Sequence, residues 1–180
     1  MLSILNSATN RRRLLGLLAA WSLAGWTGLA EATSESQMVG FKRWGSGEFR
    51  RFGFLIYKAR LWAVDHPLRP PLALQLTYQR SIAGQAIADA SVKEIRQLAM
   101  TDEATLQRWG RLMAAIFPNV QSGDQILGIY LPEGVQFQFN GRPLGRIDEQ
   151  AFAHAFFSIW LDEKTSAPEL RAALLKLPPD

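Results

Sequence analysis

The sequence predicts an α+β fold in which an antiparallel sheet is covered by helices on one face. Three observations favour this class. Segments with the two-residue period of strands come in two runs of three, and each run is followed by two segments of helical period. Strands within a run are joined by short turns, which suit antiparallel neighbours because parallel strands need a long crossover. No internal repeat or linker divides the 180 residues, so a single domain is expected.

The first run of strands follows a small, polar leader. Residues 38–44 and 48–63 have a β-like pattern, and we expect Gly45-Ser46-Gly47 to form a turn between them. The second of these segments is too long for one flat strand. Gly53 is therefore expected to mark a bend or turn within it.

The third strand and the first two helices come next. Residues 72–80 alternate as a half-buried strand, after which the period changes. Residues 84–100 form an amphipathic helix whose apolar stripe contains Ile87, Ser91, Ile95 and Leu98. A second helix is predicted from Thr101, as N-cap, to Pro118. Its inward side chains are expected to be Leu106, Trp109, Met113 and Ile116.

The second run of strands covers residues 125–131, 135–139 and 142–147. Asn140-Gly141 between the last two predicts a hairpin, because both residue types accept the positive φ of a type I′ turn. A third helix begins near Asp148. Its buried side chains are expected to be Phe152, Phe156, Ile159 and Trp160, with Trp160 counted as core. The capping box Ser166-Ala167-Pro168-Glu169 predicts a short last helix.

The N-terminal segment has the form of a signal peptide. Arg11-Arg12-Arg13 precede an uncharged, leucine-rich run over residues 14–30, and Ala30-Glu31-Ala32 offers a cleavage site after Ala32. We therefore expect residues 1–32 to be a signal peptide, residues 33–180 to be the domain, and the protein to be periplasmic. An uncleaved membrane anchor and twin-arginine export of the folded chain are the alternatives.

Charge and composition exclude several functions. Loss of three arginines and Glu31 with the signal peptide lowers the formal charge from +4 to +2, so no nucleic acid is expected as a partner. Because the same cleavage removes the apolar segment, no stable membrane span is expected in the mature protein. The chain has no cysteine, and its two histidines, His66 and His154, are far apart in sequence. We therefore expect neither a metal nor another cofactor, and no thiol chemistry.

Six motifs spread over roughly residues 44–176 carry a family resemblance. In order, they are Gly45-x-Gly47, Phe54-Leu-Ile-Tyr57-x-Ala59-x-Leu61-Trp62, Leu76-x-Tyr78-x-Arg80-x-Ile82, Gly123-Asp124, Asn140-Gly141 and Phe156-Phe157-Ser158-Ile159-Trp160-Leu161. Together they resemble the chalcone isomerase family, and more closely its exported bacterial branch. The resemblance implies an open-faced β-sandwich with a cleft between the antiparallel sheet and the helices that cover it.

The catalytic positions of plant chalcone isomerases are occupied differently in this chain. The resemblance places Phe49 at the family's strand arginine and Tyr57 at its threonine. On the first helix, Ile87, Ala90 and Glu94 stand where a tyrosine, a lysine and an asparagine would be. Without those cation and phenol donors the reaction lacks electrostatic stabilisation, so we expect no chalcone isomerase activity.

The same family includes non-catalytic relatives that bind fatty acids through an arginine and a tyrosine. Here Arg51 shares strand parity with Phe49, and Tyr57 offers a phenol on the next strand, whereas alternation places Ile56 on the opposite face from Tyr57. We expect Arg51 and Tyr57 to hold the acid group of a small amphipathic ligand, a fatty acid or an aromatic acid.

The expected ligand-binding residues are Arg51, Tyr57, Phe49, Ile87 and Glu94. Two alternatives stay open. The protein could be an isomerase or intramolecular lyase on another substrate, with Tyr57, Arg51 or Glu94 acting on a proton or a charge. It could instead be an envelope scaffold whose cleft is filled by side chains such as Phe49 and Ile87.

Overall fold

The structure, a computed structural model, describes residues 38, 40–99 and 101–176. The signal peptide predicted for residues 1–32 and its cleavage after Ala32 lie outside the described residues.

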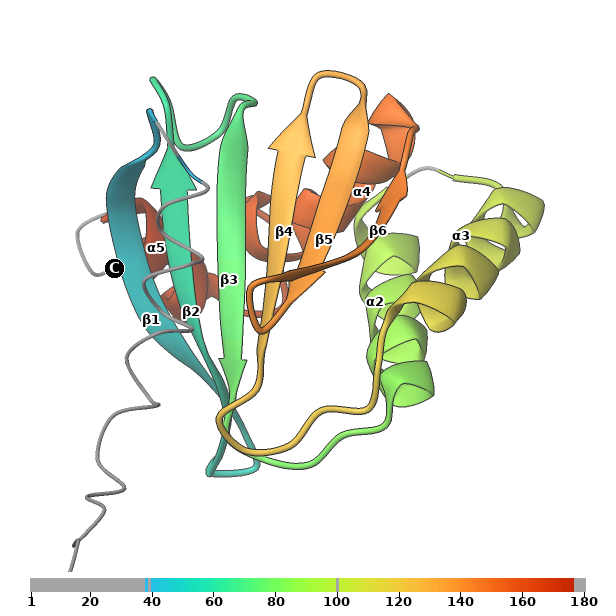
Figure 1. Cartoon of the computed structure of the whole chain (residues 1–180), viewed down its shortest axis with the longest axis horizontal. Helices are drawn as coiled ribbons and strands as arrows, with labels where there is room; N and C mark the ends of the chain where they lie inside the picture. The colour runs from blue at the N-terminus through green and yellow to red at the C-terminus, as the bar shows by residue number, and fades with distance from the viewer. Residues whose placement is uncertain (1–37, 39, 100, 177–180) are drawn as a thin grey trace, which may run out of the picture.

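Six antiparallel strands form one sheet in chain order (Figure 1). They are β1 (Lys42–Arg51), β2 (Phe54–Ala63), β3 (Leu72–Tyr78), β4 (Gln125–Leu131), β5 (Gly134–Phe139) and β6 (Arg142–Ile147). Helices α2 (Gly84–Leu98) and α3 (Glu103–Ile116) connect the central strands β3 and β4. Helices α4 (Gln150–Leu161) and α5 (Pro168–Leu175) follow β6. The element order matches the predicted one.

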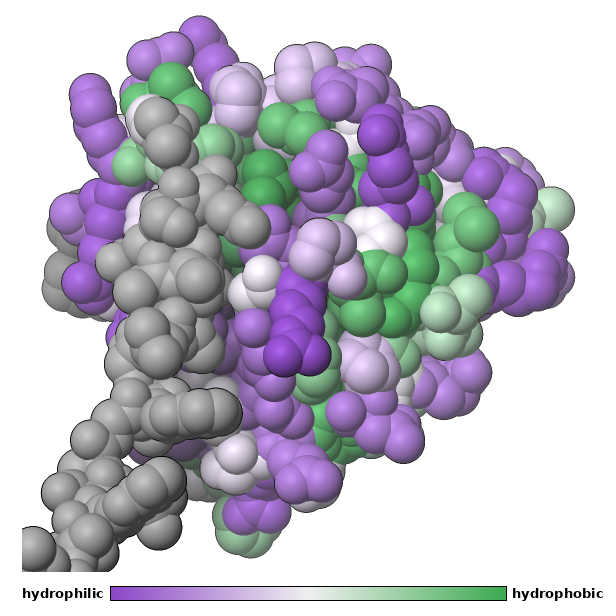
Figure 2. All heavy atoms as spheres, viewed as in Figure 1, coloured by the Kyte–Doolittle hydropathy of each residue, from purple (hydrophilic) through white to green (hydrophobic). Residues whose placement is uncertain are grey.

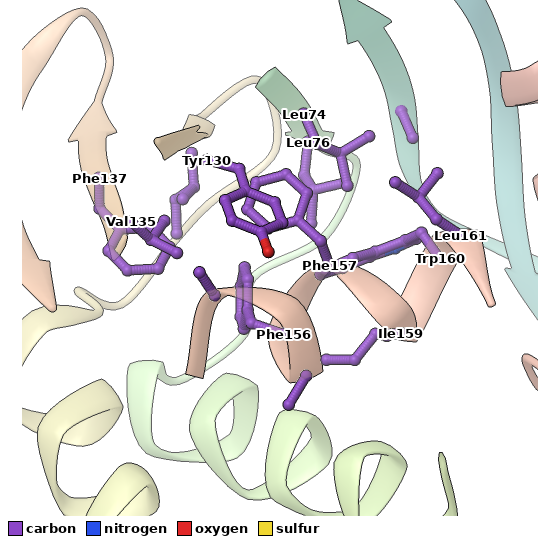
Figure 3. Packing of buried hydrophobic residues seen from close by; sticks show 14 of the residues in the cluster. Leu74, Leu76, Tyr130, Val135, Phe137, Phe156, Phe157, Ile159, Trp160 and Leu161 are labelled. Carbon is purple, nitrogen blue, oxygen red and sulfur yellow. The ribbon is translucent and has the colours of Figure 1, made fainter. Parts of the chain in front are cut away.

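The helices cover one face of the sheet, as the predicted α+β class requires. Helix α5 packs on β1 and β2, while α4 packs on β4 and β5 and carries α2 on its other side. In Figure 3, Phe157 of α4 lies beside Tyr130 of β4, and Ile159 points toward α2. The other face of the sheet, turned toward the viewer in Figure 2, mixes hydrophilic and hydrophobic residues.

The segment between β3 and β4, which contains α2 and α3, has its two ends joined by hydrogen bonds. Ile82 and Val120 form an isolated antiparallel bridge, with N to O distances of 3.0 and 2.9 Å. The side-chain oxygen of Asn119 accepts a hydrogen bond from the backbone N–H of Gly84 at 3.0 Å, where α2 begins. The start and the end of this helical segment therefore lie side by side, just before β4 begins.

The hairpin predicted at Asn140-Gly141 and the bend or turn predicted at Gly53 are both confirmed. Asn140 and Gly141 have φ values of 49° and 78°, the geometry of a type I′ turn. Phe52 and Gly53 have nearly the same pair of values, 50° and 79°, and they join β1 to β2. The bend expected at Gly53 is thus a tight two-residue turn.

The turn predicted at Gly45-Ser46-Gly47 is wrong, because these residues lie inside β1 and pair with Leu61, Arg60 and Ala59 of β2. Helix α5 crosses the strand at this point. A Cβ atom at Gly45 would lie 2.1 Å from the carbonyl oxygen of Leu174 and 2.5 Å from that of Ala173. The glycines are needed for the close approach of a helix rather than for a change of direction.

Two helix starts also differ from the prediction. The N-cap of α3 is Asp102 rather than Thr101, and its carboxylate accepts a hydrogen bond from the N–H of Thr105 at 2.9 Å. Helix α5 has Ala167 at its N-cap without a side-chain hydrogen bond. Ser166 makes no capping box, because its hydroxyl donates to Glu94 Oε2 at 2.7 Å. It thereby joins the start of α5 to α2.

Candidate functional site

A cavity of about 350 Å³ lies between the helix-covered face of the sheet and helices α2 and α4. Strands β1 to β4 supply one wall, and α2 and α4 supply the other. Most of the lining is apolar, including Leu76, Ile82, Phe117, Ile126 and Phe156. The volume is at the lower end of the range of about 300 to 1,000 Å³ that is typical of small-molecule sites.

All five residues expected to bind ligand line this one cavity. Phe49 and Tyr57 face each other across the β1–β2 pair, and their rings stack with centroids 5.0 Å apart. On α2, Ile87, Ala90 and Glu94 fall at positions i, i+3 and i+7, so they share the face of the helix that covers the cavity. The structure therefore brings the five residues together around one cavity.

A bulge in β2 overrides the alternation that placed Ile56 and Tyr57 on opposite faces. The register between β1 and β2 shifts between Phe49 and Arg50, so Ile56 has no partner in β1. Both Ile56 and Tyr57 line the cavity. A β-bulge is a common way to re-aim a side chain beside a site.

Tyr57 is held in place by a hydrogen bond from α4. Trp160 Nε1 donates to Tyr57 Oη at 3.0 Å, and an indole N–H can only donate. The phenol oxygen of Tyr57 is thus an acceptor toward Trp160. The O–H group of Tyr57 can therefore donate a hydrogen bond to a ligand.

A second phenol lies beside the first. Tyr78 of β3 pairs with Tyr57 in the sheet, and the two rings meet edge to face at 6.1 Å. Burial raises the pKa of both tyrosines well above the ordinary value, with a partly opposing contribution at Tyr57 from the Trp160 hydrogen bond. Burial also raises the pKa of Tyr130, the third tyrosine of the chain. Near neutral pH these groups are neutral donors rather than phenolates.

Because of these shifts, the free energy of unfolding is expected to fall as the pH rises above about 10. The unfolded chain releases its phenol protons near that pH, whereas the folded state keeps them, so ionisation favours the unfolded state. Urea unfolding at about pH 8 and about pH 11 measures the loss. The Tyr57→Phe variant should show a smaller loss than the wild type. An equal fall in the free energy of unfolding in both proteins would contradict the raised pKa of Tyr57.

The charged groups of the cavity are at its edge. Arg51, the last residue of β1, is exposed, and its guanidinium carbon lies 5.4 Å from the centre of the Phe52 ring. Within the described part of the chain, no carboxylate forms an ion pair with Arg51. Glu94 is engaged by the Ser166 hydroxyl. Among the residues that the structure describes, Arg51 is therefore the cation that the rim offers, beside a lining that is mainly apolar.

Other lining residues were not assigned to the site from sequence. Trp160 was expected to be core, and it is buried, but its N–H fixes Tyr57. Tyr78 and Phe156 were expected only as parts of a strand and a helix. Their period marked them as inward-facing. Which inward-facing residues border a cavity depends on how α4 packs on the sheet, and sequence period carries no information on that.

Neither a metal site nor a membrane-spanning helix is found in the described residues. No group of three or more histidine, cysteine, aspartate or glutamate side chains is placed to hold a metal ion there. None of the helices described here is both long and apolar enough to cross a bilayer.

An antiparallel sheet covered by helices, with an apolar cavity between them, defines an α+β protein of the open-faced β-sandwich class. A family model described as chalcone isomerase-like matches residues 59–176, which is more than half of the sequence. The chain belongs to the chalcone isomerase-like family.

The same fold is found among solved structures. The chain is similar to the crystal structure of a fatty-acid binding protein from Arabidopsis thaliana, with a TM-score of 0.59 and 11% sequence identity. The similarity covers 76% of this chain and 87% of the other. No curated protein sequence matches. At this identity the likeness concerns the fold, and the role of the cavity has to be argued from its own residues.

Proposed function

We propose that the protein binds a small amphipathic acid, a fatty acid or an aromatic acid, without converting it. The observation that carries this proposal is the apolar cavity with Arg51 at its edge and the Tyr57 phenol inside. The apolar part of such a ligand gains about 25 cal/mol for each Å² removed from water. Arg51 and Tyr57 supply donors for the acid group. The similar plant structure is that of a fatty-acid binding protein, which agrees with this class of ligand.

The lining argues against the chalcone isomerase reaction. At the cavity, the positions of the catalytic arginine, threonine, tyrosine, lysine and asparagine are held by Phe49, Tyr57, Ile87, Ala90 and Glu94. This set contains no cation to stabilise a phenolate or a developing oxyanion. Formation of a flavanone above the uncatalysed rate would contradict this part of the proposal.

A scaffold role with a filled cleft is less well supported. Phe49 and Ile87 border the cavity, and a volume of about 350 Å³ is left between the side chains. We also propose that the protein works after export, in the periplasm. The arginine-led apolar segment and the Ala30-Glu31-Ala32 site support that location.

Replacing Arg51 with alanine is expected to weaken the binding of a fatty acid about tenfold. A charge-assisted hydrogen bond is lost, but Arg51 is exposed, so solvent screens part of its contribution. Tyr57→Phe should weaken binding by a smaller factor, because it removes one neutral donor. Isothermal titration calorimetry with straight-chain fatty acids of increasing length measures both effects.

Arg50→Ala is the matched control. Arg50 is adjacent to Arg51 in sequence, but it pairs with Glu48 at 2.9 Å and does not border the cavity. Its loss should leave the affinity unchanged. If no fatty or aromatic acid binds the wild type, the proposed function is wrong. If Arg51→Ala and Arg50→Ala bind equally well, Arg51 is not the anchor.

A further inference from the structure

The β1–β2 turn lies at one end of the sheet (Figure 1), and two exposed aromatic rings belong to it or follow it directly. Phe52 is 87% exposed and Phe54 is 56% exposed, the two highest values among the large hydrophobic residues described. We use the name aromatic tip for Phe52, Phe54 and the two arginines that lie against them, Arg51 and Arg80. Single exposed apolar residues are ordinary, but two large exposed rings close together are typical of an interaction site.

The backbone of the turn strengthens this point. Phe52 has a φ of +50°, in the left-handed region that glycine and asparagine accept most easily. The same sheet contains a turn of almost identical geometry, and there the corresponding residue is Asn140, with a φ of +49°. The β1–β2 turn thus carries a bulky aromatic where a small polar residue would fold more easily. Such strain is typical of positions kept for function.

The charge around the rings has one dominant sign. The guanidinium of Arg80 lies 4.3 Å from the centre of the Phe54 ring, and that of Arg51 lies 5.4 Å from the centre of the Phe52 ring. Further along the same two strands, Arg50 and Lys58 both pair with one carboxylate, that of Glu48, at 2.9 and 3.8 Å. Cations therefore outnumber anions among the residues described in this region.

We propose that the aromatic tip docks the protein on an anionic lipid surface. Aromatic rings and arginines are the side chains that settle at the boundary between headgroups and acyl chains, and a cationic surround attracts anionic lipids. A narrow, protruding turn suits insertion into a soft interface better than it suits a flat protein interface. The charge complementarity and the protruding shape select lipid as the partner.

The aromatic tip lies next to the cavity, so docking through the tip could serve the transfer of a ligand. Arg51 belongs both to the tip and to the cavity lining, and Ile56, close behind the tip on β2, also lines the cavity. Docking through the tip brings that edge of the cavity to the lipid surface. An amphipathic ligand could then pass between bilayer and cavity with little exposure to water. This use rests on the proposed function, whereas the docking itself does not.

A polarity-sensitive dye at the tip tests the docking directly. Because the chain has no cysteine, Phe52→Cys gives a single labelling site. Leu68→Cys, at another exposed hydrophobic residue, is the matched control. With vesicles that contain phosphatidylglycerol, the dye at position 52 should shift to the blue and the dye at 68 should not. The shift should be absent with phosphatidylcholine alone and weaker at high salt.

This readout is local, so it is not confused by binding through other parts of the chain. No shift at position 52, or equal shifts at 52 and 68, would overturn the proposal. A shift with single-stranded oligonucleotide but none with vesicles would also overturn it, in favour of a nucleic-acid surface. As a second measure, Phe52→Ser combined with Phe54→Ser should lower vesicle binding about tenfold. These residues do not line the cavity, so fatty-acid affinity without vesicles should not change, which separates this test from that of the proposed function.

Discussion

Replacing Gly45 with alanine is expected to lower the free energy of unfolding by about 3 kcal/mol or more. The added Cβ would lie 2.1 Å from the carbonyl oxygen of Leu174 and 2.6 Å from the carbonyl carbon of the same residue. Both atoms are backbone, so no side chain can rotate away. Either α5 moves off β1, or the strand bends, and each response opens the packing between Gly47 and Leu170 as well.

Urea unfolding of Gly45→Ala beside Ser46→Ala measures this effect. Ser46 is the next residue of the same strand and is exposed, so alanine there should change the free energy of unfolding by less than about 0.5 kcal/mol. A similar small change at both positions would show that α5 does not lie on β1 as described.

Phe156→Ala is expected to cost about 3 to 5 kcal/mol of stability. The ring is buried between Phe137 and Trp160, with centroid distances of 5.3 Å to each, and stacks on Phe152 at 5.5 Å. Its loss removes contacts on several sides at once. Because Phe156 also lines the cavity beneath α2, the space that opens adds to that cavity rather than forming a separate one.

The matched control is Phe52→Ala, which makes the same chemical change at a ring that is 87% exposed. That variant should stay within about 0.5 kcal/mol of the wild type in urea unfolding. A bulkier apolar acid should bind Phe156→Ala more tightly, relative to a straight-chain acid, than it binds the wild type. Loss of stability below about 1 kcal/mol in Phe156→Ala would mean that the ring is not at the centre of the core.

The fold was largely predictable because its signals are local. Period two and period 3.6 alternate clearly along the chain, and Asn140-Gly141 has the turn chemistry that a type I′ hairpin demands. Apart from the N-cap of α3, the errors arose where a distant element decides the outcome. Gly45 and Gly47 look like a turn until α5, about 130 residues later, is placed on the strand. Ser166 looks like a helix cap until Glu94 is brought beside it.

The candidate site also contains some features that could be predicted from the sequence and others that could not. Phe49, Tyr57, Ile87 and Glu94 could be placed from motifs, because each lies at a fixed offset within a strand or helix. The bulge at Ile56 and the hydrogen bond from Trp160 to Tyr57 could not. The first depends on a register between two strands, and the second joins residues that are 103 positions apart. Sequence period indicates which side chains turn inward, but it does not say which ones meet.

The segment that holds α2 and α3 is closed at its base, so the pairing of the strands does not depend on the helix that lines the cavity. The two ends of this segment meet at Ile82 and Val120, and β3 and β4 pair directly with each other, so the sheet has its full set of strand partners without this insert. Substitutions on the cavity face of α2, such as at Ile87 or Ala90, can change the shape of the wall without altering any strand pairing. The shape of the cavity wall can therefore change while the sheet that supports it stays constant.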